Sequence, residues 1–232
     1  RRQASFVNKS FTDDSLFQLS VGEKYTSDST DITVNLVYTI LPGGELLINA
    51  ETIIPDDHPV VPRIGLNLKL DKQYSNLRWH GRGPHESYAD RKHGAFIGEY
   101  SGSVEEQYYP YIRPQENGNK TDVKWASLSN SDGDGLIIFG IPIFNLSVHQ
   151  YSLENLTAAT HTYMVEDSDR ITVNMDHLVM GLGGDDSWSP RTHKEYLIKP
   201  GTYNYSFILR FSNNIKADTK KSIDIRVSSL FN

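Results

Sequence analysis

Short runs in which apolar and polar residues alternate recur along almost the whole chain. This period of two is typical of strands that bury one face, and the runs are rich in Val, Ile, Thr, Tyr and Phe, which favour strands. The turn sequences Pro42-Gly43-Gly44 and Asp132-Gly133-Asp134-Gly135 each separate two runs and predict hairpins. The sequence therefore predicts an all-β fold. The expected strands cover residues 32–40, 45–53, 63–70, 135–141, 144–151, 170–178 and 203–211.

One short helix is expected over residues 152–159, where Ser152 could cap the N-terminus and Leu156 lies on the apolar face. With 232 residues the chain is long enough for one large core, so we predict a single domain over residues 1–232. Its ends, at about residues 1–12 and 213–232, are expected to be partly flexible. Because the sequence begins at Arg1 without a Met, we expect it to be part of a longer polypeptide.

Composition excludes several classes of function. Lys and Arg number 23 against 29 Asp and Glu, a net charge of −6 with no basic block, so we expect no nucleic acid partner. No run approaches the roughly 18 apolar residues that cross a bilayer, so no membrane partner is expected either. The absence of Cys excludes disulfides, thiolate metal sites and a cysteine nucleophile, and the eight His lack metal-binding spacing. We predict no metal site in this chain.

The stretch between Trp79 and Trp125 lacks clean periodicity, and we interpret it as long ordered loops, which on a β scaffold are often functional. Its first segment reads Trp-His-Gly-Arg-Gly-Pro-His-Glu-Ser-Tyr-Ala-Asp-Arg over residues 79–91. Such mixtures bind sugars, because aromatic rings cover the C–H face of a sugar while charged groups bond its hydroxyls. The alternative is structural: Arg91 pairs with Asp90 or Glu86 and fixes the loop.

The second segment, residues 108–119, reads Tyr-Tyr-Pro-Tyr-Ile-Arg-Pro-Gln-Glu-Asn-Gly-Asn. Two prolines stiffen it, so we expect Glu116 and Asn117 to be displayed with little conformational entropy left to lose. They would serve either as ligand contacts or as a lock on the loop.

The third segment, residues 180–190, reads Met-Gly-Leu-Gly-Gly-Asp-Asp-Ser-Trp-Ser-Pro. Its glycines have neither the dinucleotide-binding nor the P-loop spacing, and no helix pattern follows, so a phosphate cradle is not expected. Trp188 stands out, because a large aromatic in a Gly-rich, acidic loop is expected to be exposed. Placement of Trp188 in the core is the competing interpretation.

At these segments the chain resembles the C-terminal domain, also called domain 5 or the small-chain domain, of the bacterial β-galactosidases of glycoside hydrolase family 2. The resemblance runs from about Val34 to Arg210. It implies a β-supersandwich of the galactose-mutarotase-like type, with two large antiparallel sheets face to face. The matching stretches are Pro62-Arg63-Ile64-Gly65-Leu66-Asn67, Gly83-Pro84-His85-Glu86-Ser87-Tyr88-Ala89-Asp90-Arg91, Pro114-Gln115-Glu116-Asn117-Gly118 and Gly183-Gly184-Asp185-Asp186-Ser187-Trp188-Ser189-Pro190.

In that family this domain reaches the mouth of the active site, and the Trp of the last motif helps to form a platform for the leaving sugar. The resemblance therefore implies a substrate-binding role for Trp188. It implies a part in shaping or supporting the rim for the other matching residues, which are Glu86, Asp90, Arg91, Glu116, Asn117, Asp185 and Asp186.

The family's catalytic carboxylates belong to a barrel domain that this sequence does not contain. Retaining hydrolysis needs two carboxyls roughly 5–5.5 Å apart, and the sequence nominates no such pair. We therefore predict no catalytic residue in this chain and no glycosidase activity for it alone. The Mg and Na ions of the full enzyme are expected mainly outside this domain. The implied partners are galactosides such as lactose, the rest of the β-galactosidase chain and further subunits of an oligomer, in a bacterial cytoplasm or periplasm.

Two other functions remain open. One is a stand-alone aldose mutarotase or epimerase, in which His85 with Glu86 or Glu116 would act as acid and base. The other is a structural module whose loops only support an oligomer.

Overall fold

The computed structural model describes residues 2–12, 16–26, 30–186, 188–189 and 191–221, and the prediction of an all-β fold is confirmed. Within these residues the two α-helices are α1 (Leu153–Ala158) and α2 (Ile215–Lys221), and three single turns of 3-10 helix lie in loops. None of the described helices has the length and apolar character needed to cross a membrane. The strands are β1 (Arg2–Phe11), β2 (Phe17–Thr26), β3 (Asp31–Ile40), β4 (Leu46–Ile54), β5 (Arg63–Asp71), β6 (Asn76–Gly83), β7 (Phe96–Ser103), β8 (Lys120–Ser129), β9 (Gly135–His149), β10 (Arg170–Val179) and β11 (Gly201–Ser212).

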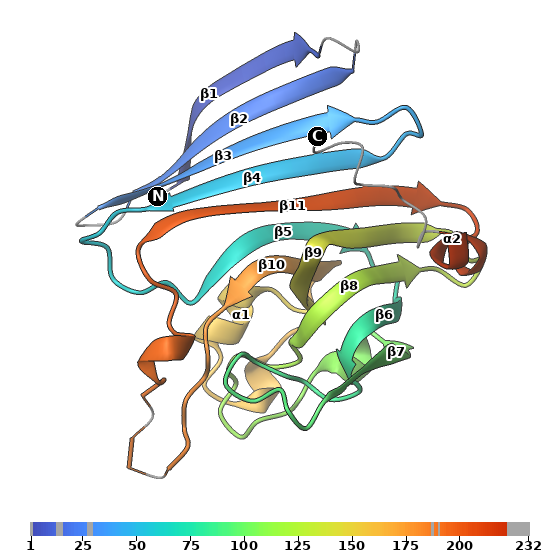
Figure 1. Cartoon of the computed structure of the whole chain (residues 1–232). Helices are drawn as coiled ribbons and strands as arrows, with labels where there is room; N and C mark the ends of the chain where they lie inside the picture. Colours follow the sequence, from blue (N-terminus) through green and yellow to red (C-terminus); the bar gives the residue numbers. More distant parts are fainter. Residues whose placement is uncertain (1, 13–15, 27–29, 187, 190, 222–232) are drawn as a thin grey trace.

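The strands form one antiparallel sheet in the order β1-β2-β3-β4-β11-β9-β8-β6-β7, from which β10 and β5 branch at β9 (Figure 1). The long strand β9 makes the branch. Its first half, residues 135–141, pairs with β11, and its second half, residues 145–149, pairs with β10. The two layers expected from the sequence are therefore continuous through β9, which appears in the sequence as two separate runs.

The core lies between the layer of β5 and β10 and the layer of β3, β4, β11, β9 and β8. Alternate residues of facing strands meet there, for example Ile64 of β5, Met175 of β10 and Phe207 of β11. The backbone approaches closely at Gly65, where an added Cβ would lie 2.4 Å from the carbonyl oxygen of Met175. This close pairing fixes β5 against β10 and sets the position of Arg63 at the start of β5.

Local predictions are confirmed at the hairpins and the first helix. The turns at residues 42–44 and 132–134 join β3 to β4 and β8 to β9. Helix α1 begins after Ser152, whose Oγ accepts a hydrogen bond from the backbone N–H of Asn155 at 3.1 Å.

The interpretation of the Trp79–Trp125 stretch as loops is wrong in part, because it contains much of β6, all of β7 and the start of β8. In β6 every second residue is buried, but two of those positions are Gly81 and Gly83, which hide the period-two pattern. A Cβ at Gly81 would lie 2.8 Å from Val123, and one at Gly83 would lie 2.6 Å from Tyr100. Large neighbours thus replace the missing side chains.

The expected flexible ends are only partly described. Residues 2–11 form β1, which pairs with β2 along its length, and residues 215–221 form α2. Residues 222–232 lie outside the described part of the chain. The flexibility of both ends stays a prediction.

Candidate functional site

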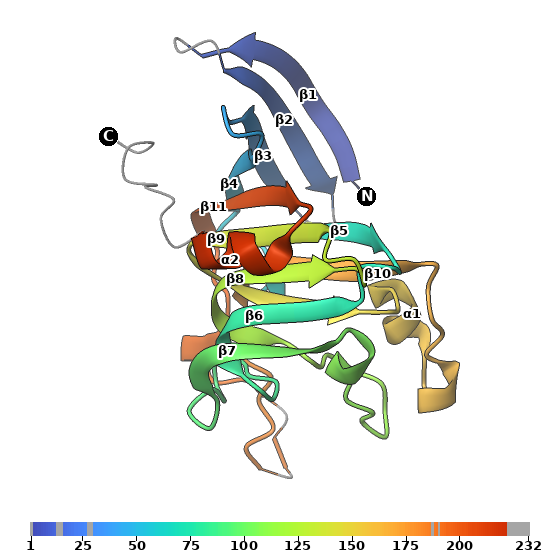
Figure 2. The same ribbon diagram turned by 90° about the vertical axis from the view of Figure 1, so that its right-hand side faces the viewer.

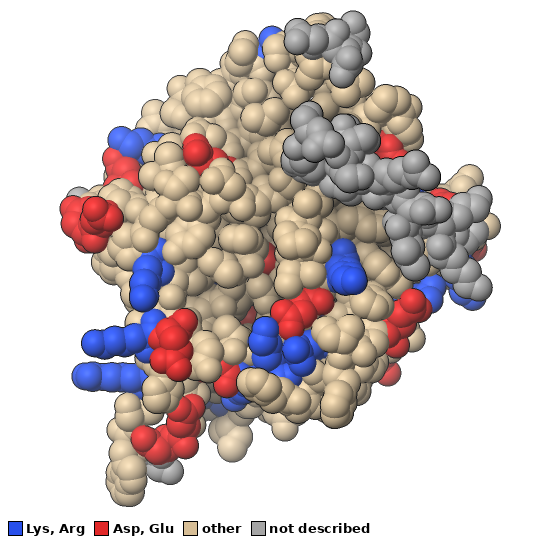
Figure 3. All heavy atoms as spheres, viewed as in Figure 1, with Lys and Arg blue, Asp and Glu red and all other residues tan. Residues whose placement is uncertain are grey.

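The loops that carry the three sequence motifs lie at one end of the molecule. They connect β6 to β7, β7 to β8 and β10 to β11, and they extend below the strands in Figure 1 and in the perpendicular view of Figure 2. Charged side chains gather over the lower half of the face shown in Figure 3. We call these three loops the rim.

Trp188 is 93 % exposed, so the interpretation that places it in the core is wrong. Its backbone is held by Asp186, whose Oδ1 accepts hydrogen bonds from the N–H groups of Trp188 at 2.7 Å and Ser189 at 2.5 Å. An Asp side chain that bonds the backbone two residues on stabilises a turn. The turn therefore presents the indole to solvent. Ser187 and Pro190 lie outside the described residues.

The loop that carries Trp188 is fastened below this turn. The N–H of Gly183 donates to Asp90 Oδ2 at 2.8 Å, which ties the loop to the first motif. Gly183 and Gly184 have φ values of 69° and 79°, a conformation that glycine adopts without steric strain. Asp185 Oδ2 lies 2.5 Å from Nε2 of His193 on the returning side of the loop.

Glu86 links the first motif to the second. One carboxylate oxygen accepts a hydrogen bond from the Tyr111 hydroxyl, and the other accepts one from the N–H of Gly118 at 2.7 Å. Burial and the hydrogen bond to Glu86 raise the pKa of Tyr111 to about 12. Arg91 lies 3.9 Å from Glu86 and stands over the Tyr88 ring at 5.3 Å. The pairing of Arg91 with Glu86 is thus present. It joins the first loop, through the contact of Arg91 with Tyr88, to the second loop, which Glu86 bonds.

Asn117 is 1 % exposed, so the expectation that it is displayed is wrong. Its Oδ1 accepts a hydrogen bond from the N–H of Tyr109 at 3.1 Å. Its Nδ2 donates to the carbonyl of Gln115 and to the Tyr151 hydroxyl, each at 2.9 Å. Asn117 therefore lies in the interior and fastens the second loop through these hydrogen bonds.

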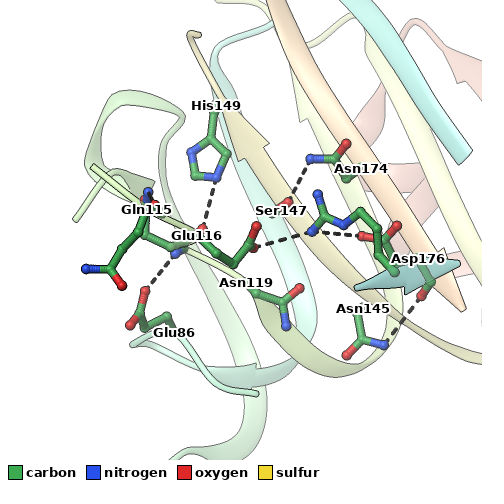
Figure 4. Close-up of polar contacts among 12 residues, drawn as sticks. Glu86, Gln115, Glu116, Asn119, Asn145, Ser147, His149, Asn174 and Asp176 are labelled. Atoms are coloured by element: carbon green, nitrogen blue, oxygen red, sulfur yellow. Dashed lines mark hydrogen bonds and ion pairs between the residues drawn. The ribbon is translucent and has the colours of Figure 1, made fainter. Parts of the chain in front are cut away.

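Glu116 forms an ionic cluster with two residues from the sheet. Arg63 Nη2 lies 3.3 Å from Glu116 Oε1 and 3.3 Å from Asp176 Oδ2 (Figure 4). Burial raises the pKa of Asp176 to about 7, although Arg63 acts in the opposite direction, and burial also raises the pKa of Glu116. One guanidinium thus holds a loop carboxylate against a carboxylate in the middle of β10.

Further polar side chains extend this cluster into the sheet next to the rim. Asn174 donates to Ser147 at 2.9 Å (Figure 4). It also accepts from Asn67 at 2.7 Å, so these bonds link β5, β10 and β9. His149 Nε2 lies 3.1 Å from the carbonyl oxygen of Asn117, and burial lowers the pKa of this His to about 3. His149 is therefore neutral, and it contacts the backbone of the second loop from the end of β9. Buried Lys120 donates to the carbonyl of Gly118 at 3.0 Å, and burial lowers its pKa to about 8.

The carboxylates of the rim accept hydrogen bonds from backbone N–H groups or form ion pairs with Arg side chains. Glu116 and Asp176 are close to each other, but Asp176 is 2 % exposed and a substrate could not reach it. His85 is exposed, and within the described residues it makes no hydrogen bond to Glu86 or Glu116. The described residues also contain no group of three or more His, Cys, Asp or Glu that could hold a metal ion. Structurally, the rim is a set of loops fastened by hydrogen bonds and ion pairs, and its most exposed aromatic side chain among the described residues is Trp188, followed by Tyr109 at 56 %.

The family model for the β-galactosidase small chain matches residues 3–209. The chain belongs to this family. Curated relatives named β-galactosidase include those of Priestia megaterium, 40 % identical over 79 % of this chain and 18 % of the relative, and Pseudoalteromonas haloplanktis, 44 % identical over 75 % of this chain and 16 % of the relative. The match thus spans less than a fifth of the length of these relatives. The resemblance stated from the sequence is confirmed.

Two solved structures resemble this small-chain fold more distantly. A GalM/aldose epimerase homologue from C. elegans has a TM-score of 0.42 and 11 % identity, with coverage of 90 % of this chain and 69 % of that one. A galactose mutarotase related enzyme from Lactobacillus acidophilus has a TM-score of 0.34 and 8 % identity, with coverage of 92 % and 72 %.

Sequence reasoning about the small-chain motifs missed the residues that support the rim from the sheet. Arg63 stands in one of the matching stretches, but nothing near it in sequence indicates two carboxylate partners. Asp176 gave no signal, because it alternates with the apolar residues of β10 in phase with the polar Thr172 and Asn174, although all three polar residues are buried. Lys120 and His149 also gave no signal, because their burial depends on the second loop, whose backbone they contact.

Proposed function

We propose that this chain is the small-chain domain of a β-galactosidase that hydrolyses terminal β-D-galactosides such as lactose, and that Trp188 forms part of the platform for the leaving sugar. The observation that carries the proposal is the 93 % exposure of an indole whose loop is fastened on both sides. A fixed aromatic face binds the C–H side of a sugar ring with little loss of conformational entropy. Family membership supports the choice of a galactoside.

The bond-breaking carboxylates belong, in this proposal, to the remainder of a longer polypeptide. The described carboxylates of the rim support this division of roles, because they already have structural partners. Glu86, Asp90 and Asp186 accept hydrogen bonds from backbone N–H groups, and Glu116 accepts one from Arg63. A nucleophile or general acid needs an open side next to the scissile bond. The chain alone is therefore expected to be inactive, and any Mg or Na ions of the enzyme would be bound mainly in the other domains.

The test of the sugar platform uses the β-galactosidase polypeptide that contains this domain. Replacement of Trp188 by Ala should weaken binding of an acceptor sugar such as glucose by about 5- to 150-fold, the equivalent of about 1–3 kcal/mol of stacking. Cleavage of an aryl galactoside should change much less. Phe211→Ala is the matched control, because Phe211 is 73 % exposed on β11 and lies outside the rim. Equal acceptor binding by the Trp188 variant and the wild type would remove Trp188 from the site.

A second test uses the 232-residue chain alone with a chromogenic β-galactoside. We expect no turnover above buffer. Turnover that survives purification would place a catalytic pair inside this domain and would contradict the division of roles.

A further inference from the structure

A groove that the rim does not use runs between β2–β4 and the edge strand β5. It has a volume of about 590 Å³ and lies on the inner side of the sheet. Ile32, Val34 and Tyr38 of β3 are only partly buried in it, as are Leu66 and Leu68 of β5. We call it the β3–β5 groove.

The alternation of side chains indicates that this groove is an interior face, and the described residues leave it uncovered. On β3 the residues that line it are Ile32, Val34, Leu36 and Tyr38, all on one side of the strand. The opposite side is polar, as Asn35 illustrates by donating to Glu51 at 2.8 Å. A sheet with one apolar and one polar face buries the apolar face against another layer. The layer of β5 and β10 supplies that cover over β4 and β11 and ends at β5.

The edge of β5 that faces the groove is free among the described strands. β5 pairs with β10 along its whole length, and no other described strand pairs with it. The backbone N–H and C=O groups on its other side are therefore available to a further strand. An edge strand beside an uncovered apolar surface is the arrangement that binds an extended segment by strand addition.

We propose that an extended segment from the remainder of the longer β-galactosidase polypeptide adds as a strand to the free edge of β5 and covers the β3–β5 groove. The proposal rests on the proposed function only in assuming that remainder. The relatives named above match this chain over 16–18 % of their length, so they contain ample further polypeptide. The lining also defines the occupant: an apolar residue at every second position facing Val34 and Leu66, and polar residues near the Arg2–Glu23 pair at the groove's end.

Hydrogen exchange measured by mass spectrometry tests the added strand directly. Peptides covering β5 are compared in the 232-residue chain and in the full polypeptide. The amides of β5 that do not bond β10 should exchange about tenfold or more slowly in the full polypeptide, because a new strand protects them. Equal exchange of β5 in both proteins would overturn the proposal. Because this experiment measures backbone protection, a failure of the Trp188 test leaves its result unaffected.

A charge placed in the groove provides the second test. Leu66→Lys should shift the denaturation midpoint strongly in the full polypeptide and much less in the 232-residue chain, where the half-buried side chain can reach water. Ile53→Lys is the control, because Ile53 lies on β4 next to the groove-lining residues Thr52 and Ile54, is 37 % exposed and is not part of the groove lining. Its effect should be the same in both proteins. Equal shifts for Leu66→Lys in the two proteins would contradict the proposal.

Light scattering of the 232-residue chain tests the alternative occupant of the groove, which is a second copy of this chain. A monomer with a rapidly exchanging β5 is the expected result. A dimer in which β5 is already protected would overturn the proposal in favour of pairing between two copies of this chain.

Discussion

Asp90 accepts a hydrogen bond from the backbone N–H of Gly183 at 2.8 Å, across 93 positions of sequence. The same carboxyl group fills the space beside Gly181, where an added Cβ would lie 2.7 Å from Asp90 Cγ. The first and third sequence motifs are therefore parts of one structure. The position of the loop that carries Trp188 depends on a carboxylate in another loop.

Replacement of Asp90 by Ala should loosen the base of the Trp188 loop. The change removes the acceptor for a partly buried N–H, which costs on the order of 1–3 kcal/mol of stability. Urea denaturation and hydrogen exchange of residues 181–184 measure the two effects. Asp57→Ala is the control, because Asp57 is exposed in the turn that follows β4. The interpretation fails if both variants behave alike.

Replacement of Glu86 by Gln should destabilise the contact between the first and second loops. Both carboxylate oxygens accept hydrogen bonds, from Tyr111 and from Gly118, and an amide offers only one acceptor. We expect a loss on the order of 1–3 kcal/mol in the free energy of unfolding. Glu99→Gln provides the comparison, because the Glu99 side chain is 59 % exposed and lies 3.7 Å from Arg78. Identical urea midpoints for the two variants would show that Glu86 does not fasten the loops.

The fold could be predicted where each strand carries its own pattern. Runs such as β3 and β10 alternate clearly, and Gly44 supplies the positive φ, 85°, that the turn between β3 and β4 requires. Strand β6 was missed because its buried positions include Gly81 and Gly83, so the apolar volume comes from Val123 and Tyr100 on other strands. A pattern completed by distant residues is not visible in one segment.

The candidate site could be predicted only in part for the same reason. An indole in a short acidic glycine loop has no neighbours to bury it, so the exposure of Trp188 followed from its local sequence. The burial of Asn117 did not, because it depends on Tyr151, which lies 34 positions away. Local stiffness from the prolines indicated that the loop is ordered but not which side chains point inward.

Replacement of Asp186 by Ala should release the turn that presents Trp188. Two backbone N–H groups lose their acceptor, whereas Asp186→Asn keeps the Oδ1 position and serves as the matched control. Fluorescence of the 232-residue chain reports the change, because Trp79 and Trp125 are buried and only Trp188 is exposed to a quencher. We expect lower anisotropy of the quenchable emission in the Ala variant. An unchanged anisotropy would mean that Asp186 does not restrain the indole.

Asp176 should make stability fall as the pH rises toward neutrality. Burial raises its pKa from 3.8 to about 7, so the folded protein binds more protons than the unfolded chain between these values. The stabilisation is fully present below pH 3.8 and is lost as the pH passes about 7, with a slope of up to about 1.4 kcal/mol per pH unit. Neutral His149, whose pKa burial lowers from 6.5 to about 3, acts in the opposite sense below pH 6.5. The difference between wild type and Asp176→Asn therefore isolates the carboxyl group. Urea unfolding from pH 5 to pH 8 should show the Asn variant gaining stability relative to the wild type as the pH rises, whereas parallel curves would mean that Asp176 titrates alike in the folded and unfolded states.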